Sequence, residues 1–204
     1  MSEPLWSLEV AETTPGTYLA DEKLLAATLQ GGLSSATVRT AIAQSLGSAP
    51  LTLELIRTDG KGLHDKAVAV GDILLFNWMP VFSESAYELL LSEGCSEAEF
   101  LDCRFRVLGS RSFKAHIPLL NYDVIDFPCS IAMHSIPLKP PIPFRFVSVK
   151  LKPTPMKLPP CFRVQAPGHL QVLSELFALE SFRAAWLSAG LQGAHFRRLA
   201  HGAP

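Results

Sequence analysis

Hydrophobic and polar residues alternate in several stretches of the chain, and this pattern predicts β-strands. In the stretch Leu51–Leu55, Thr52 and Glu54 separate three leucines. Successive side chains of a strand point to opposite faces, so this stretch is expected to bury its leucines on one side. By the same reasoning, strands are predicted at 100–107, 144–151 and 194–199, and a short apolar run predicts a further strand at 72–76.

Two helices are predicted in the first quarter of the chain, the first from its acidic first turn and the second from apolar residues recurring every three to four positions. One covers 21–30 and is ended by Gly31 and Gly32, while the other covers 34–46 and is ended by Gly47. Glycine is common just past the last turn of a helix because it adopts the left-handed conformation without strain.

Two more helices are predicted further along. One opens at 81–84 and is capped by Ser83 or Ser85, since Ser85 and Glu88 have capping-box spacing. The other begins near Ser174–Glu175 and carries the longest apolar stripe in the chain. Serine is a frequent N-cap because its hydroxyl accepts a backbone N–H that has no partner inside the helix.

These elements predict an α+β fold with a mainly antiparallel mixed sheet and three to four helices. The 204 residues fit a single domain of roughly 100–250 residues. The pattern is least regular over 1–70 and clearer over 71–199, where prolines interrupt the predicted strands between 113 and 151.

Composition favours a folded, soluble protein. Hydrophobic residues make up 48% of the chain and charged residues 18%, with a net charge of −1. Such a chain can build a core, and it has no global field that would attract nucleic acid or an anionic membrane. It contains neither a signal-like start nor an apolar run long enough to span a membrane, so we expect a cytoplasmic protein.

No motif predicts a catalytic, cofactor-binding or metal-binding residue. Nucleotide-binding loops, nucleophile elbows and zinc-ligand spacings are all missing from the sequence. A meeting of His116 with Asp123 or Cys129 in space is left open by the sequence. We interpret the cysteines as buried, reduced thiols: Cys95, Cys103, Cys129 and Cys161.

Aromatic and basic residues alternate near Phe144–Phe146 and again at Phe196–Arg198. Rings interleaved with cations can form a stacking surface for single-stranded nucleic acid. The same alternation is typical of a strand with phenylalanine inward and arginine outward, which is the interpretation that we favour.

Six short segments between residues 70 and 199 carry motifs in a fixed order. They are 71–74 (GDIL), 81–86 (VFSESA) with Leu89–Leu90, 99–101 (EFL), 120–126 (LNYDVID) with Ser130, 161–164 (CFRV), and 172–177 (VLSELF) continuing to 190–196 (GLQGAHF). Together they resemble the immunity proteins of bacterial polymorphic-toxin systems, in particular the family first catalogued as an uncharacterised domain in myxobacteria and other proteobacteria. Ala86 and Gln192 depart from the family pattern, which more often has a basic residue and a threonine there.

This resemblance implies a cytoplasmic protein encoded beside a secreted toxin, which it binds and silences during competition between bacteria. The family has no assigned catalytic residue. Aromatic and arginine side chains dominate the energetics of many interfaces, so Trp78, Tyr122 and Arg145 are the predicted toxin-binding anchors. The segment Lys139–Pro160 is the predicted contact loop.

Two other functions stay open. A small, hydrolase-like enzyme that reverses or degrades a toxin product would need a deep pocket with converging His, Asp or Cys side chains. An adaptor or structural subunit of a secretion system would need permanent association through a large apolar surface. The oligomeric state is not indicated by the sequence.

Overall fold

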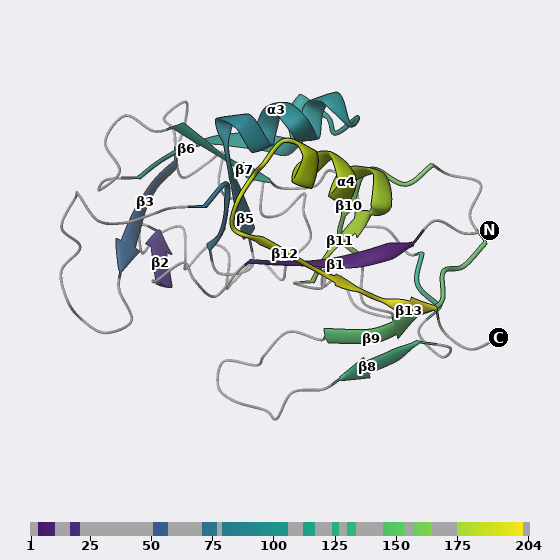
Figure 1. Cartoon of the computed structure of the whole chain (residues 1–204). Helices are drawn as coiled ribbons and strands as arrows, with labels where there is room; N and C mark the ends of the chain where they lie inside the picture. The colour runs from purple at the N-terminus through teal and green to yellow at the C-terminus, as the bar shows by residue number, and fades with distance from the viewer. Residues whose placement is uncertain are drawn as a thin grey trace.

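The computed structural model describes residues 4–10, 17–20, 51–56, 71–76, 79–105, 112–116, 124–126, 130–133, 145–153, 157–164 and 175–201 (Figure 1). Within these stretches the chain is a small single-domain α+β protein with largely antiparallel sheets. Its strands are β1 (Leu5–Val10), β2 (Thr17–Ala20), β3 (Leu51–Ile56), β4 (Ile73–Phe76), β5 (Met79–Ser83), β6 (Phe100–Phe105), β7 (Ser112–His116), β8 (Ile131–Met133), β9 (Arg145–Val149), β10 (Cys161–Phe162), β11 (Leu176–Leu179), β12 (Ala194–Arg198) and β13 (Ala200–His201). The helices are α3 (Glu84–Ser92), α4 (Glu180–Ser188) and the short 3-10 helix η1 (Glu97–Glu99).

A four-stranded antiparallel sheet in the order β10-β11-β1-β12 joins the two ends of the chain. Leu8 of β1 is paired with Leu176 of β11 on one side and with Phe196 of β12 on the other. The N-terminal strand is therefore an inner strand between C-terminal ones, as the purple and yellow strands in Figure 1 show.

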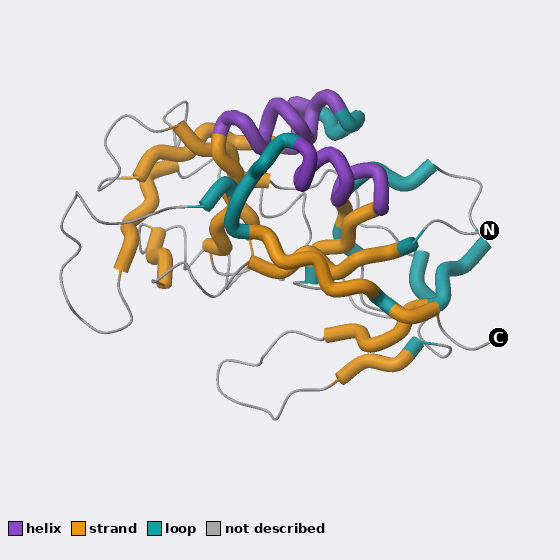
Figure 2. Tube along the Cα trace, in the orientation of Figure 1, coloured by secondary structure: helices purple, strands orange, loops and turns teal. Residues whose placement is uncertain are grey.

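The two faces of this sheet bury different cores. Leu8 and Leu176 point toward the helices and pack with Trp186 of α4. Phe177, one position further along β11, points the other way and meets Phe146 of β9 with ring centroids 5.9 Å apart. The sheet is thus a middle layer with helices on one face and a second sheet on the other (Figure 2).

A six-stranded sheet in the order β2-β3-β6-β7-β5-β4 supports helix α3. Its pairs are antiparallel except for β3 and β6, which run parallel. Strands β2 and β4 stand at opposite edges and are also in contact with each other, so the sheet curls.

A three-stranded sheet in the order β13-β9-β8 covers the face of the four-stranded sheet that lies away from the helices (Figure 1). β13 runs parallel to β9, and β8 runs antiparallel to it with a bulge between Ile131 and Ala132. Beyond β9, the Lys152 N–H donates to Val124 O at 2.8 Å and the Asp126 N–H donates to Lys150 O at 2.8 Å. These bonds extend the sheet past the end of β9.

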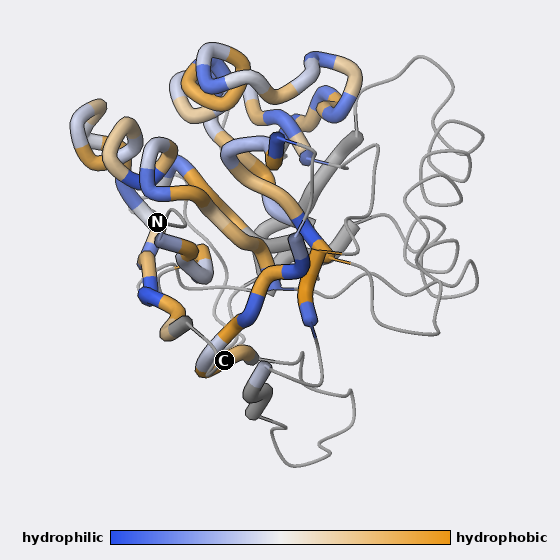
Figure 3. Tube along the Cα trace, turned by 90° about the vertical axis from the view of Figure 1, so that its right-hand side faces the viewer, coloured by the Kyte–Doolittle hydropathy of each residue, from blue (hydrophilic) through white to orange (hydrophobic). Residues whose placement is uncertain are grey.

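Hydrophilic and hydrophobic residues alternate along the two helices, as expected for helices with one face on the core (Figure 3). No side chain caps α4, whose N-cap is Leu179. Its first turn is instead fixed to β1 by Trp6, whose Nε1–H donates to Glu180 at 2.5 Å. The Arg183 guanidinium lies 4.3 Å from the Trp6 ring centroid, a cation–π contact that adds to this anchor.

The described residues contain two α-helices, fewer than the three to four predicted. The helices predicted at 21–30 and 34–46 lie outside the described residues. The C-terminal helix does not begin near Ser174, because Leu176–Leu179 forms β11 and α4 begins at Glu180. This apolar run is buried on both faces as an inner strand, and such strands read like helix segments in a sequence.

The start predicted for α3 is also corrected. Residues 81–83 belong to β5, which contains Pro80 opposite Leu75. Pairing of β5 with β7 begins only at Val81, so the N–H that proline lacks is not needed for that ladder. Ser83 is the N-cap, whereas Ser85 lies inside the helix and is not the cap.

The four strands predicted from alternation are confirmed within a few residues as β3, β6, β9 and β12, and the strand predicted from a short apolar run is confirmed as β4. Cys103 is buried and Arg104 exposed, as the alternation in β6 predicts. Among the described residues, no helix is both long and apolar enough to cross a membrane.

Candidate functional site

Asp72 ties together three segments that are far apart in the sequence. Its Oδ1 accepts the Ser83 hydroxyl at 2.7 Å, and its Oδ2 accepts the Gln192 backbone N–H at 2.7 Å. Its main chain repeats both links, since Asp72 N–H donates to Gln192 O at 2.8 Å and Ser83 N–H donates to Asp72 O at 2.9 Å. We call Asp72, Ser83 and Gln192 the Asp72 clasp.

Two glycines allow the clasp to close. A Cβ placed on Gly71 would lie 2.8 Å from the Cα of Gly193, closer than real side chains come. Gly193 also has φ of +90°, a conformation that favours glycine. The backbones of 71–72 and 192–193 touch because neither glycine carries a side chain.

The Asp72 clasp unites three of the segments that resemble the immunity family: 71–74, 81–86 and 190–196. Both carboxylate oxygens of Asp72 accept hydrogen bonds from other parts of the chain. The Asp72 clasp is therefore a contact that helps to define the fold. These motifs position the start of α3 and the turn after α4.

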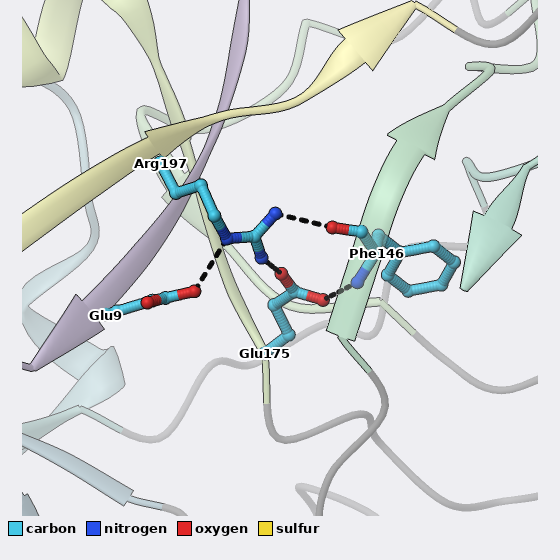
Figure 4. Close-up of polar contacts among 4 residues, drawn as sticks. All are labelled: Glu9, Phe146, Glu175 and Arg197. Atoms are coloured by element: carbon cyan, nitrogen blue, oxygen red, sulfur yellow. Dashed lines mark hydrogen bonds and ion pairs between the residues drawn. The ribbon is translucent and has the colours of Figure 1, made fainter. Parts of the chain in front are cut away.

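A second polar cluster crosses from one sheet to another (Figure 4). Arg197 of β12 donates from Nε to Glu9 at 2.8 Å and from its two terminal nitrogens to Glu175 at 2.9 Å and to the Phe146 carbonyl at 2.6 Å. Glu175 in turn accepts the Phe146 N–H at 2.9 Å. We call these four residues the Arg197 bridge.

Electrostatics explain why the Arg197 bridge is well paired. Burial raises the pKa of the Glu175 carboxyl above its usual value, and the Ser7 hydroxyl, the Phe146 N–H and the Arg197 guanidinium oppose part of that rise. The side chain of Glu175 is 5% exposed, against 31% for that of Arg197. A nearly buried carboxylate needs such partners, because an unpaired one loses its hydration without compensation.

The Arg197 bridge holds β9 through its main chain. Both polar backbone groups of Phe146 are bound, and the Phe146 and Val149 side chains are buried in the core between the sheets. Val147 points away from that core and is 43% exposed, one of two large hydrophobic residues in the described part of the chain that are exposed. Val147 is therefore an exposed apolar residue on a strand whose backbone is held by the Arg197 bridge.

The predicted anchors are placed only in part. Trp78 and Tyr122 lie outside the described residues, and Arg145 is described only as the first residue of β9. The predicted contact loop Lys139–Pro160 is described over 145–153 and 157–160. It forms β9, its paired extension and the approach to β10, with Lys152 and Lys157 exposed.

The described thiols lie inside the core. Burial raises the pKa of Cys95 and of Cys103 to about 12, and burial raises the pKa of Cys161 as well. Such thiols stay protonated near neutral pH and are poor nucleophiles. The interpretation of buried thiols is confirmed for these three, and Cys129 lies outside the described residues.

His116 is a second buried group. Its Nε2 lies 3.5 Å from an oxygen of Glu99, and its ring sits 5.0 Å from that of Phe100, measured between centroids. The partners considered for it in the sequence, Asp123 and Cys129, lie outside the described residues. In the described stretches, no three His, Cys, Asp or Glu side chains are grouped to hold a metal ion.

Neither polar cluster is recognisable in the sequence. Glu9 and Arg197 are 188 positions apart, and Asp72 and Gln192 are 120 apart. The one available signal is chemical, since Glu175 is a lone carboxylate just before a strongly apolar run. Comparisons with models of known protein families and with curated proteins find no match to this chain.

Proposed function

We propose that this protein is an immunity protein, which binds a cognate secreted bacterial toxin in the cytoplasm and neutralises it by stoichiometric occlusion. The observation that carries the proposal is the Asp72 clasp. Segments 71–74, 81–86 and 190–196 resemble one family in sequence, and they also meet at one point in space. Motifs that define a common fold are expected to lie far apart in the sequence and to meet in the folded structure.

The positions of the described cysteines, of His116 and of Asp72 favour binding over chemistry. Cys95, Cys103, Cys161 and His116 are buried, and Asp72 is engaged on both oxygens. Nucleophiles and general bases must reach a substrate, so these side chains are better suited to packing and to fixing the fold. The proposal therefore assigns no catalytic residue, cofactor or metal.

The remaining predicted features are part of the same proposal. Trp78, Tyr122 and Arg145 are the proposed anchors, and Lys139–Pro160 is the proposed contact segment. A toxin is silenced only when nearly every copy is bound, so the dissociation constant is expected to be nanomolar or lower, about −12 kcal/mol or stronger. Replacing an anchor with alanine is expected to cost about 2 kcal/mol or more of binding free energy.

The test is a titration of the purified toxin domain encoded by the adjacent gene, with toxin activity as the readout. Occlusion predicts that activity falls in proportion to added protein and is lost near one equivalent. Protection at a small fraction of an equivalent would mean turnover and would favour the enzyme alternative. Absence of binding, together with stable self-association at submicromolar concentration, would favour the adaptor alternative.

A further inference from the structure

Charge is unevenly distributed along this nearly neutral chain. Residues 139–160 include five basic residues and no acidic one: Lys139, Arg145, Lys150, Lys152 and Lys157. Residues 84–102 show the opposite, with six acidic residues and no basic one: Glu84, Glu88, Glu93, Glu97, Glu99 and Asp102. Helix α3 and strand β9 lie on opposite sides of the four-stranded sheet (Figure 1), so the acidic residues of α3 are separated in space from the basic stretch where it forms β9.

The backbone of the basic stretch is held by hydrogen bonds between residues 146 and 152. The Arg197 bridge binds both backbone groups of Phe146. The Lys150 N–H donates to the Ser130 hydroxyl at 3.0 Å, and the Lys152 N–H donates to Val124 O at 2.8 Å. A surface fixed before binding loses little conformational entropy on association.

This stretch also combines the two properties of a protein-binding surface. Val147 provides an exposed apolar residue on β9, and Lys152 and Lys157 provide exposed cations beyond the strand. Interfaces commonly place apolar contact at the centre and charges at the rim, where charge speeds association and selects partners. One acidic residue lies next to this surface: the Asp126 N–H donates to Lys150 O, in the segment 124–126 that pairs with the end of the stretch.

We propose that the surface formed by β9 and its basic extension, over residues 145–153 together with Lys157, is where the toxin docks, and that the toxin presents an acidic surface to it. This inference rests on the proposed function, narrows the proposed contact segment to the described residues around β9, and adds the chemistry of the partner's surface. The partner is a folded protein with clustered Asp and Glu side chains around an apolar spot that meets Val147.

Nucleic acid fits this surface less well. Single-stranded binding uses aromatic rings as stacking platforms, but Phe146 and Phe162 are buried at 1% and 0% exposure. Sequence-independent binding of a duplex relies on a strongly positive field, and the whole chain has a net charge of −1. Binding of an acidic protein surface requires only a local positive charge, which the exposed Lys152 and Lys157 provide.

The experiment measures binding of the purified toxin domain to the full-length chain and to four variants. Lys152→Glu with Lys157→Glu, and separately Val147→Asp, are each expected to weaken binding by about tenfold or more. Raising the salt concentration is expected to weaken binding of the native chain and to have less effect on the Lys152→Glu, Lys157→Glu variant.

The matched controls lie outside β9 and its extension. Arg104→Glu reverses an exposed charge on β6 of the six-stranded sheet. Leu187→Asp changes the other exposed large hydrophobic residue, which is 53% exposed on α4. Both are expected to bind the toxin domain as the native chain does. Thermal unfolding of every variant shows whether it is folded. If a variant has the unfolding midpoint of the native chain but binds the toxin domain more weakly, the loss of binding is assigned to the altered surface.

Three outcomes would contradict the inference, and they are distinguishable. If the native chain binds and all four variants bind equally, the proposed function stands and the docking surface is wrong. If the native chain does not bind the toxin domain at micromolar concentration, the proposed function and the surface both fail. If a fluorescent 20-nucleotide DNA binds the native chain but not the lysine variant, the surface is a nucleic-acid site instead.

Discussion

The Ser83 hydroxyl donates to Asp72 Oδ1 at 2.7 Å while it accepts the Ala86 N–H at 3.3 Å. One hydroxyl therefore both caps α3 and connects that helix to the loop after α4, since Asp72 also binds Gln192. A hydroxyl can fill both roles because it has one proton to donate and two lone pairs to accept with. The start of α3 is fixed by tertiary contact as well as by its local cap.

Replacing Ser83 with alanine removes the cap and the bond to Asp72. We expect the free energy of unfolding to fall by about 1–3 kcal/mol, the sum of a lost N-cap and a hydrogen-bond acceptor left with fewer partners. Urea denaturation measures this change. Ser85→Ala is the matched control, because Ser85 is exposed inside α3 and alanine is the better helix former. Equal losses in the two variants would contradict the role of Ser83.

Replacing Gly193 with alanine tests the close approach of two backbones. Its new Cβ would lie 3.1 Å from Gly71 Cα and 3.1 Å from Ile73 O, at φ of +90°. Gly94→Ala is the control, since Gly94 has φ of +105° but a Cβ added there would have no atom of another segment within 4 Å. We expect backbone strain of about 1–3 kcal/mol in both variants and about 1–3 kcal/mol more in Gly193→Ala from crowding. Equal unfolding free energies would show that the loop moves aside without cost.

Alternation along the sequence predicts strands that have one solvent face, and it fails where both faces are covered. β9 is recognisable because buried Phe146 is followed by exposed Val147. β1 is not recognisable, because Leu5, Ser7 and Leu8 are all buried between two layers. β11 resembles a helix segment for the same reason. Inner strands lose the two-residue period because neither of their faces meets water.

The sequence predicts which segment forms the proposed docking surface, but it does not predict the contacts that hold this segment in place. The run of prolines and lysines over 139–160 marks a surface segment, and its basic residues are visible in the sequence. The Arg197 bridge joins residues that are 22 to 188 positions apart, a separation for which one sequence carries no pattern. The contacts that hold the surface in place can therefore be identified from the structure but not from the sequence.

Iodoacetamide labelling at pH 8 tests the buried thiols. A pKa of about 12, as for Cys95 and Cys103, leaves roughly one molecule in 10,000 as the reactive thiolate at that pH. We expect no label on Cys95, Cys103 or Cys161 in the native chain by mass spectrometry, and full label on all three in 6 M guanidinium. Rapid native labelling of Cys161, which is 2% exposed, would mean that the edge of the four-stranded sheet opens readily. Cys129 lies outside the described residues and is not part of this prediction.

The buried carboxyl of Glu175 is expected to make stability depend on pH. Burial raises its pKa above the ordinary value of 4.5, so the folded chain holds this proton more tightly than the unfolded chain does. The stabilising contribution of the protonated Glu175 carboxyl is therefore fully present below about pH 4.5 and is lost as the pH rises through the folded pKa.

The Glu175→Gln variant tests this, because glutamine has no proton to lose at position 175. The unfolding free energy of the native chain minus that of the variant should decrease as the pH rises across this window. Urea denaturation at several values between pH 4 and pH 7 gives the difference. Ser85→Ala keeps every carboxyl and should follow the native chain at each pH. A difference that stayed constant or grew with pH would show that the polar partners of the Glu175 carboxylate (Ser7, Phe146 and Arg197) outweigh burial, and that the bridge is at its strongest when the carboxyl is charged.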